Sequence, residues 1–343
     1  IVFMKRFSLW RYRFLCVFIF TLGLLLAFLF IGWPKTTKHI TYGITWSIPY
    51  AQFLGVDSQD GLSAVLTEMN IKHVRLPAYW PLVEPSPDLL QTAWLKAQLD
   101  IVEKNGAKAT VVLGARQPRW PECWIPDWAL ARTEQEQKDA QLVYIDHVFE
   151  TLKDHPAISA SQIENEANLR SFMKCRGNDN AFVKQEIDRI RAMEQSRPNP
   201  RPIVTTESGE LTSWLTFAMN ADQIGFSVYR VVRQPSGWVF RYTLVPPWFY
   251  GRKAALLSPF IKKTYVSEFQ MEPWATTDIR EATPQENNET FSVKDVDAHF
   301  DYAEKMGYQQ IDLWGAEWWY WMKTQKGNAD YWNAIKERVN LAQ

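Results

Sequence analysis

The sequence predicts one α/β domain, a (β/α)₈ TIM barrel, preceded by one N-terminal transmembrane helix. Eight short β-rich runs alternate with amphipathic helical stretches over residues 40–343, without a Gly/Ser linker or a break in composition. No glycine-rich phosphate loop follows the first run, whereas a doubly wound sheet would usually have one. A separate uncharged run of 20 residues, 14–33, lies ahead of the alternating part.

Residues 14–33 are long enough to cross a bilayer. A helix rising 1.5 Å per residue spans a hydrocarbon core of roughly 30 Å in about 20 residues. Four basic residues lie before the run, so we expect the short tail, residues 1–13, to stay in the cytoplasm and the barrel to lie outside it. No small-residue cleavage motif follows, which favours an uncleaved signal anchor in contact with lipid over a secretory signal peptide.

The charge distribution argues against a nucleic-acid partner. The formal net charge is zero, with 38 basic and 38 acidic residues, but six basic residues and no acidic one lie in the first 39 positions. The remainder is therefore net acidic, and it lacks the excess of Lys and Arg that phosphate binding needs. Hydrophobic residues make up 46% of the chain, which excludes a disordered protein.

The predicted elements follow in a regular order. Each β-rich run is bounded by turn residues, and each helical stretch has apolar residues at helical spacing. The predicted strands are 41–46, 72–77, 108–114, 159–166, 202–208, 223–229, 263–268 and 310–315. The predicted helices are 61–69, 88–104, 134–153, 181–194, 209–219, 251–259, 292–305 and 330–341.

Two glutamates end predicted strands, Glu166 on the fourth and Glu268 on the seventh. In a (β/α)₈ barrel the chemistry lies at the carboxyl ends of the strands, so both side chains should project into one pocket. Two carboxylates on either side of a bond are the equipment of glycoside hydrolysis, one acting as acid and the other as nucleophile. A retaining mechanism would place the carboxyl groups roughly 5–5.5 Å apart.

Residues 40–343 resemble the clan A retaining glycoside hydrolases, close to the family 5 cellulase and mannanase group. The most specific match is Asn165-Glu166 at the end of the fourth strand together with Glu268 at the end of the seventh. The resemblance implies that Glu166 is the acid/base and Glu268 the nucleophile. It also implies that Asn165 hydrogen-bonds the substrate 2-hydroxyl, whose contacts strengthen in the transition state.

Four further positions fit the same resemblance or depart from it. Arg75 ends the second strand and resembles the arginine that keeps the nucleophile ionised. Tyr229 ends the sixth strand and resembles the tyrosine that hydrogen-bonds the nucleophile, and Trp314 ends the eighth and resembles the tryptophan under the sugar. Ser227 stands where the family often has a histidine.

Other acidic residues near strand ends have competing interpretations. Glu164 lies deeper in the barrel than Glu166, and we expect it to be structural. Glu207 ends the fifth strand and either binds substrate or forms a salt bridge, for example with Arg75. Glu272 and Glu317 follow strand ends, where they could contact sugar hydroxyls or be solvated loop residues.

The chain has 17 tryptophans, more than one core usually needs. Trp46, Trp80 and Trp274 fall in or near loops after strands, where their flat apolar faces could stack on sugar rings. The run WGAEWWYW after the eighth strand is the best candidate for a sugar platform, and a packed cluster is its alternative. Trp94 and Trp214 are expected in helices, as core residues.

Cys123 and Cys175 follow neighbouring strands and could form a disulfide at the barrel rim, whereas Cys16 lies in the membrane run. The five histidines show no H-x-H or H-E-x-x-H spacing, so no metal and no cofactor are expected. No G-x-S-x-G motif indicates a serine hydrolase.

These features predict a membrane-tethered retaining glycosidase acting on an extracytoplasmic, β-linked poly- or oligosaccharide. A transglycosylase remodelling a surface polysaccharide would use the same residues with another acceptor. A catalytically silent glycan-binding barrel is the third interpretation. The oligomeric state does not follow from the sequence.

Overall fold

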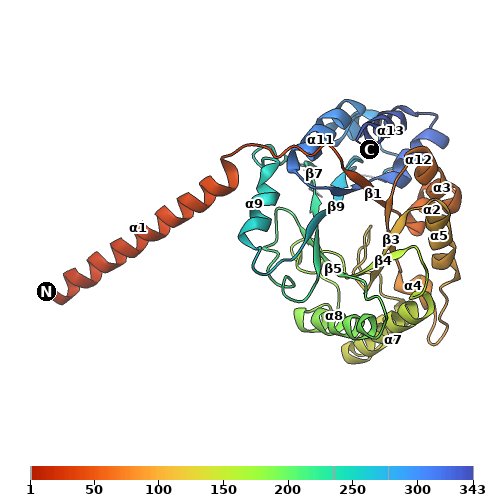
Figure 1. The fold of residues 1–343 in the computed structure, drawn as a ribbon, viewed down its shortest axis with the longest axis horizontal. Coiled ribbons are helices and arrows are strands. Elements are labelled where there is room, and N and C mark those ends of the chain that lie inside the picture. The colour runs from red at the N-terminus through yellow and green to blue at the C-terminus, as the bar shows by residue number, and fades with distance from the viewer. Residues whose placement is uncertain (1, 235, 277, 343) are drawn as a thin grey trace.

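Eight parallel strands close into a barrel in the computed structural model, which describes residues 2–234, 236–276 and 278–342. Around the barrel the strands follow the order β1, β2, β3, β4, β5, β6, β9 and β10, and β10 pairs with β1 to close the sheet. Helices surround the barrel, while α1 projects away from it as a long rod (Figure 1). The predicted (β/α)₈ fold is confirmed.

All eight predicted strands form. Their bounds are β1 (Thr41–Thr45), β2 (His73–Pro77), β3 (Lys108–Leu113), β4 (Ile158–Ile163), β5 (Ile203–Ser208), β6 (Gln223–Val228), β9 (Thr264–Gln270) and β10 (Gln310–Trp314). Nearly every residue in them is buried, as expected for parallel strands covered on both faces.

Seven of the eight predicted helices form, with small shifts at their ends. They are α3 (Ser58–Glu68), α5 (Ala93–Lys104), α7 (Glu134–Leu152), α8 (Asn180–Gln195), α9 (Trp248–Leu256), α11 (Val293–Met306) and α13 (Asp330–Leu341). Local capping sets several starts: Asp57 accepts hydrogen bonds from the first turn of α3, and Thr133 forms a capping box with Glu136 at α7. Helix α5 starts five residues later than predicted, because Asp88 has a left-handed φ of 65° and the amide of Gln91 is hydrogen-bonded back to the carbonyl of Val83.

The helix predicted at 209–219 is wrong, since this segment forms turns between β5 and β6. Trp214 lies in its middle with a φ of 69°, which no right-handed helix accommodates. The indole of Trp214 is fully buried and donates a hydrogen bond to the carbonyl of Ser208 at 2.8 Å. Burying this one large side chain in the core thus overrides the helical pattern of the segment.

Short elements in the loops complete the fold. Five are helical: α2 (Ile48–Leu54), α4 (Trp80–Val83), α6 (Asp127–Leu130), α10 (Pro284–Thr290) and α12 (Ala316–Thr324). Two short strands, β7 (Val231–Arg233) and β8 (Val239–Arg241), pair as an antiparallel hairpin after β6. These insertions lie mostly at the carboxyl ends of the strands, where they shape the barrel mouth.

The N-terminal half of the barrel interior is polar and closely packed. His73 Nδ1 lies 2.9 Å from Asp312 Oδ1, and His73 Nε2 lies 2.9 Å from Thr110 Oγ1. A β-carbon at Gly43 would come within 2.1 Å of Asp312 Oδ1, so only glycine leaves room for this network. The polar interior links β1, β2, β3 and β10 below the mouth.

Helix α1 (Val2–Phe30) contains an 18-residue stretch, Arg13–Phe30, with a mean hydropathy of 2.5 and no buried residue. Its C-terminal end contacts α9. The rings of Phe30 and Phe249 lie 5.3 Å apart, and Arg252 Nη1 donates a hydrogen bond to the carbonyl of Ile31 at 2.5 Å. By length and composition, this helix could be a membrane anchor or a signal sequence.

Candidate active site

The chain turns sharply where β4 ends, at Glu164, Asn165 and Glu166. Both Glu164 and Glu166 have positive φ, at 56° and 46°. The carboxylate of Glu164 turns toward the loop after β3 and accepts hydrogen bonds from the amides of Ala115 and Arg116 at 2.8 and 2.5 Å. It also occupies the place where a β-carbon at Gly114 would lie. Glu164 therefore has the structural role expected of it.

Glu166 is held at the mouth by β5 and β6. Its amide donates to Thr206 Oγ1 at 2.9 Å, and its Oε1 accepts a hydrogen bond from Ser227 Oγ at 2.5 Å. Only 6% of the residue is exposed. Burial, followed by the negative charges of Glu268 and Glu122, raises the pKa of Glu166 to about 8. A carboxyl group in this environment is protonated near neutral pH and can donate a proton.

Glu268 is placed by contacts from two other strands. Its Oε1 accepts a hydrogen bond from Arg75 Nη2 at 2.5 Å, and its Oε2 accepts one from the Tyr229 hydroxyl at 2.9 Å. Arg75 reaches it from β2, across the barrel interior, and is itself fully buried. The ion pair and the hydrogen bond orient both carboxylate oxygens, and Arg75 compensates the charge.

Ser227 connects the two carboxyl groups. It faces Glu268 directly in the register of β6 and β9, while its hydroxyl bonds Glu166. Because adjacent strands lie about 4.8 Å apart, the two glutamates flank one serine. The effect of Glu268 on the pKa of Glu166 is consistent with this proximity. The two carboxyl groups therefore lie in different electrostatic environments: Glu166 accepts a hydrogen bond from a neutral serine, and Glu268 is paired with a buried arginine.

Asn165 lies beside this pair, whereas the partners of Glu207, Asn168 and Thr212, belong to the loops after β4 and β5. Asn165 Oδ1 accepts a hydrogen bond from Thr206 Oγ1 at 3.0 Å, so the amide nitrogen is the group left for a substrate hydroxyl. Glu207 is fully buried and accepts a hydrogen bond from Asn168 Nδ2 at 2.5 Å. Of the two alternatives for Glu207, the salt bridge to Arg75 does not form, since Arg75 donates to Glu268 and to the carbonyl of Ser267.

Two of the four tryptophans predicted for substrate binding lie at the mouth. Trp314 ends β10, and Trp274 packs edge-to-face on Tyr229 with ring centroids 5.5 Å apart. The prediction that Trp46 and Trp80 bind substrate is wrong, because both have no exposed surface and belong to the core. Trp46 bonds Ser58 Oγ, and Trp80 bonds Glu84 Oε2 and stacks on Tyr144.

The prediction of a sugar platform after β10 is also wrong, and its alternative, a packed cluster, forms. The run forms α12, and its tryptophans at 318 and 319 are fully buried rather than presented as a platform. Glu272 and Glu317 are not solvated loop acids, because both are buried and paired with Arg119. Burial raises the pKa of Glu272, against the opposing effect of Arg119.

Sequence reasoning missed the contribution of the loop between β3 and α6. Cys123 in this loop forms the expected disulfide with Cys175, with 5.3 Å between their Cα atoms. Its neighbour Glu122 pairs with Arg116 at 2.8 Å, and the charge of Glu122 contributes to the raised pKa of Glu166. In the sequence, the only signal for this role of Glu122 was its position next to Cys123, a cysteine predicted to form a disulfide.

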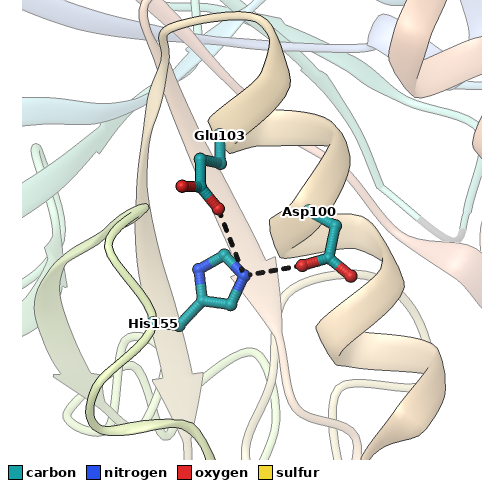
Figure 2. A group of neighbouring side chains, drawn as sticks. All are labelled: Asp100, Glu103 and His155. Atoms are coloured by element: carbon teal, nitrogen blue, oxygen red, sulfur yellow. Dashed lines mark hydrogen bonds and ion pairs between the residues drawn. The ribbon is translucent and has the colours of Figure 1, made fainter.

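One cluster of the described residues has the composition of a metal site, Asp100 and Glu103 of α5 with His155 (Figure 2). His155 Nδ1 accepts a hydrogen bond from the amide of Ala157, so Nε2 carries the proton that points to Asp100 at 3.0 Å. Lys96 Nζ already contacts both oxygens of Asp100. A histidine that donates through Nε2 and a lysine already paired with Asp100 fit a surface hydrogen-bond network better than a metal site.

Comparisons with known proteins connect this geometry to a class of fold. No family model matches the sequence, and no curated protein matches it. GH5_18 from Bifidobacterium longum subsp. longum, solved with Manβ1-4GlcNAc, is 13% identical with a TM-score of 0.58, over 80% of this chain and 69% of that one. A monomeric β-xylosidase from Caulobacter crescentus CB15 is 14% identical with a TM-score of 0.55, over 82% and 61%.

A β-galactosidase from the psychrophilic Marinomonas ef1 is 14% identical with a TM-score of 0.53, over 80% of this chain. This chain spans 54% of the length of that β-galactosidase. The structural neighbours are clan A glycoside hydrolases, so the resemblance expected from the sequence is confirmed at the level of the fold. At these identities the comparison concerns the fold alone, and the chemistry depends on the site.

Proposed function

We propose that this protein is a retaining glycoside hydrolase that cleaves a β-linked saccharide by double displacement. The observation that carries the proposal is the arrangement of Glu166 and Glu268 around Ser227. Glu166 is a buried carboxyl group with a pKa raised to about 8, and Glu268 is held by Arg75 and Tyr229. One group suits proton donation and the other suits attack on carbon.

In the first step Glu268 attacks the anomeric carbon, and the bond from that carbon to the leaving oxygen breaks. The proton of Glu166 passes to the leaving oxygen, and a covalent glycosyl-enzyme forms on Glu268. In the second step Glu166, now ionised, takes a proton from water, whose oxygen attacks the same carbon and releases Glu268. Tyr229 and Arg75 stabilise the departing carboxylate, and neither a metal nor a cofactor takes part in these steps.

We further propose that α1 anchors the enzyme in a membrane, with the barrel outside the cytoplasm. The apolar stretch Arg13–Phe30 has the length of a bilayer span, and basic residues precede it. The disulfide between Cys123 and Cys175 supports this topology, because such bonds persist in oxidising compartments. The substrate would then be a polysaccharide or oligosaccharide outside the cytoplasm.

Substitution of the proposed nucleophile tests the mechanism. Glu268→Gln keeps a hydrogen-bond acceptor for the buried Arg75, whereas Glu268→Ala would leave that cation unpaired and endanger folding. We expect Glu268→Gln to fold, with an unchanged circular dichroism spectrum, and to lose at least about 10³-fold in kcat on aryl β-glycosides. Substantial residual hydrolysis by the folded variant would overturn the assignment.

A 2-deoxy-2-fluoro glycosyl fluoride provides an independent test, because it should trap the covalent intermediate on Glu268. Peptide mass spectrometry would locate the label, and Glu268→Gln is the matched control. A structure of the trapped enzyme would measure the carboxyl separation, which a retaining mechanism places at about 5–5.5 Å. Product analysis with excess saccharide acceptor distinguishes hydrolysis from transglycosylation. Saccharide binding without turnover or labelling would indicate the silent glycan-binding barrel.

A further inference from the structure

Arg119 reaches across the barrel mouth. It belongs to the loop after β3, and its guanidinium pairs with Glu272, two residues past the end of β9, on the opposite side of the barrel. Its Nη2 also lies 2.6 Å from Oε2 of Glu317, in the first turn of α12. We call Arg119, Glu272 and Glu317 together the Arg119 strap. All three residues are buried.

Aromatic rings hold the guanidinium of Arg119 in place. The ring centroid of Tyr50 lies 4.0 Å from the guanidinium carbon, and that of Trp314 lies 4.1 Å from it. One face of Trp314 is therefore occupied by protein and unavailable to a sugar. Stacked cation and ring pairs of this kind are favourable when they are withdrawn from water.

The backbone around Arg119 is anchored as well. The Tyr79 hydroxyl donates to the carbonyl of Pro118 at 2.9 Å, and the Trp124 indole donates to the carbonyl of Arg119 at 3.2 Å. On the far side, Oε1 of Glu317 accepts a hydrogen bond from the amide of Ser47 at 2.6 Å. Opening the strap would break several buried polar contacts together, which favours a fixed wall over a mobile lid.

The two proposed catalytic groups give the substrate a direction. Glu268 lies on β9, and Glu166 lies on the side of β9 that β6 occupies, so the leaving oxygen must face that side. The sugar that Glu268 attacks must therefore extend from β9 toward the opposite side, where β10 and β1 lie. Trp314, on β10, pairs in register with Gln270, two residues beyond Glu268, so the strap begins directly behind that sugar.

We propose, building on the glycosidase function above, that the Arg119 strap closes the non-reducing side of the site behind a single sugar. The enzyme then removes sugars one at a time from non-reducing ends. Glu272 and Glu317 hold the Arg119 guanidinium against Trp314, so the wall stands where a second sugar on the non-reducing side would lie.

Synthetic substrates test the direction of cleavage. A panel of 4-nitrophenyl β-monosaccharides identifies the accepted sugar, and the matching 4-nitrophenyl β-disaccharide is then compared with it. We expect kcat/KM for direct nitrophenol release from the disaccharide to be at least 100-fold lower. A reduced oligosaccharide of the same sugar should shorten by one unit at a time. Direct release of intact disaccharide at a comparable rate, or internal cleavage of the oligosaccharide, would overturn the inference.

Variants of the Arg119 strap test whether it causes the preference for the monosaccharide substrate. Arg119→Ala should raise the ratio of disaccharide to monosaccharide cleavage at least tenfold, and Arg119→Lys, which keeps the cation, should change it less. Because Arg119→Ala leaves two buried carboxylates unpaired, Arg119→Ala/Glu272→Gln/Glu317→Gln is the second variant. An unchanged ratio in a variant shown to be folded by its thermal unfolding transition contradicts the assignment.

An active enzyme that cleaves internally refutes the strap proposal alone. Failure to turn over or be labelled by any glycoside refutes the proposed function, and the strap proposal with it.

Discussion

At the level of single residues, Ser227 is the link between the two proposed catalytic carboxyl groups. The hydrogen bond from its hydroxyl stabilises the ionised form of Glu166 and lowers its pKa, against the larger opposing effects of burial and of Glu268. The family that this chain resembles often has a histidine at this position. Here the serine in its place lowers the pKa of Glu166. A small hydroxyl takes part in setting the proton affinity of the acid.

The pH profile should reveal this contact. Glu166 must be protonated to act as the acid, so kcat/KM should fall as the pH rises through about 8. In Ser227→Ala the ionised form loses a hydrogen bond, so the pKa of Glu166 should rise and the alkaline limb should move to higher pH. Ser161→Ala, at another buried serine of the barrel, is the control. An unmoved limb, or one displaced to lower pH, would contradict this account.

At the level of elements, the loops after β3 and β4 are joined at the mouth by one covalent bond. The disulfide between Cys123 and Cys175 spans 52 positions of sequence and fixes the loop that carries both Glu122 and Arg119. In the chain-entropy view, closing a loop of that length restricts the unfolded chain by about 4 kcal/mol, and observed gains are typically about 2–4 kcal/mol.

Removing the disulfide should therefore destabilise the protein. We expect Cys123→Ser/Cys175→Ser to lower the free energy of unfolding by about 2–4 kcal/mol, measured by denaturant titration. Dithiothreitol should reproduce the effect in the unmodified protein. Cys16→Ser is the matched control, since that cysteine is unpaired and exposed on α1. Equal stability of the double variant and the control would show that the bridge contributes nothing.

At the level of the whole molecule, α1 and the barrel meet at α9, where Arg252 caps the end of α1. If α1 spans a membrane, charged residues near its centre should oppose insertion by about 2.5–3.5 kcal/mol each. We expect Leu24→Lys/Leu26→Lys to move the full-length protein from the membrane fraction to the carbonate-soluble fraction. Leu89→Lys/Leu341→Lys, at exposed leucines of the barrel, should leave it in the membrane fraction. Retention of the helix variant in the pellet would count against the anchor.

The sequence by itself determined the eight strands, seven of the helices between them, the closed barrel that they imply, and the two glutamates at strand ends. These features depend on local periodicity and on the rule that parallel strands bring their carboxyl ends to one face. The expected roles of Arg75 and Tyr229 came from the resemblance to a known family. Only the tertiary structure decided which aromatic and acidic residues reach that face. Trp46 and Trp80 are buried because distant segments cover them, and Arg119 pairs with Glu272 and Glu317 across the mouth. Burial and cross-barrel pairing depend on residues far apart in the chain, and no local pattern records them.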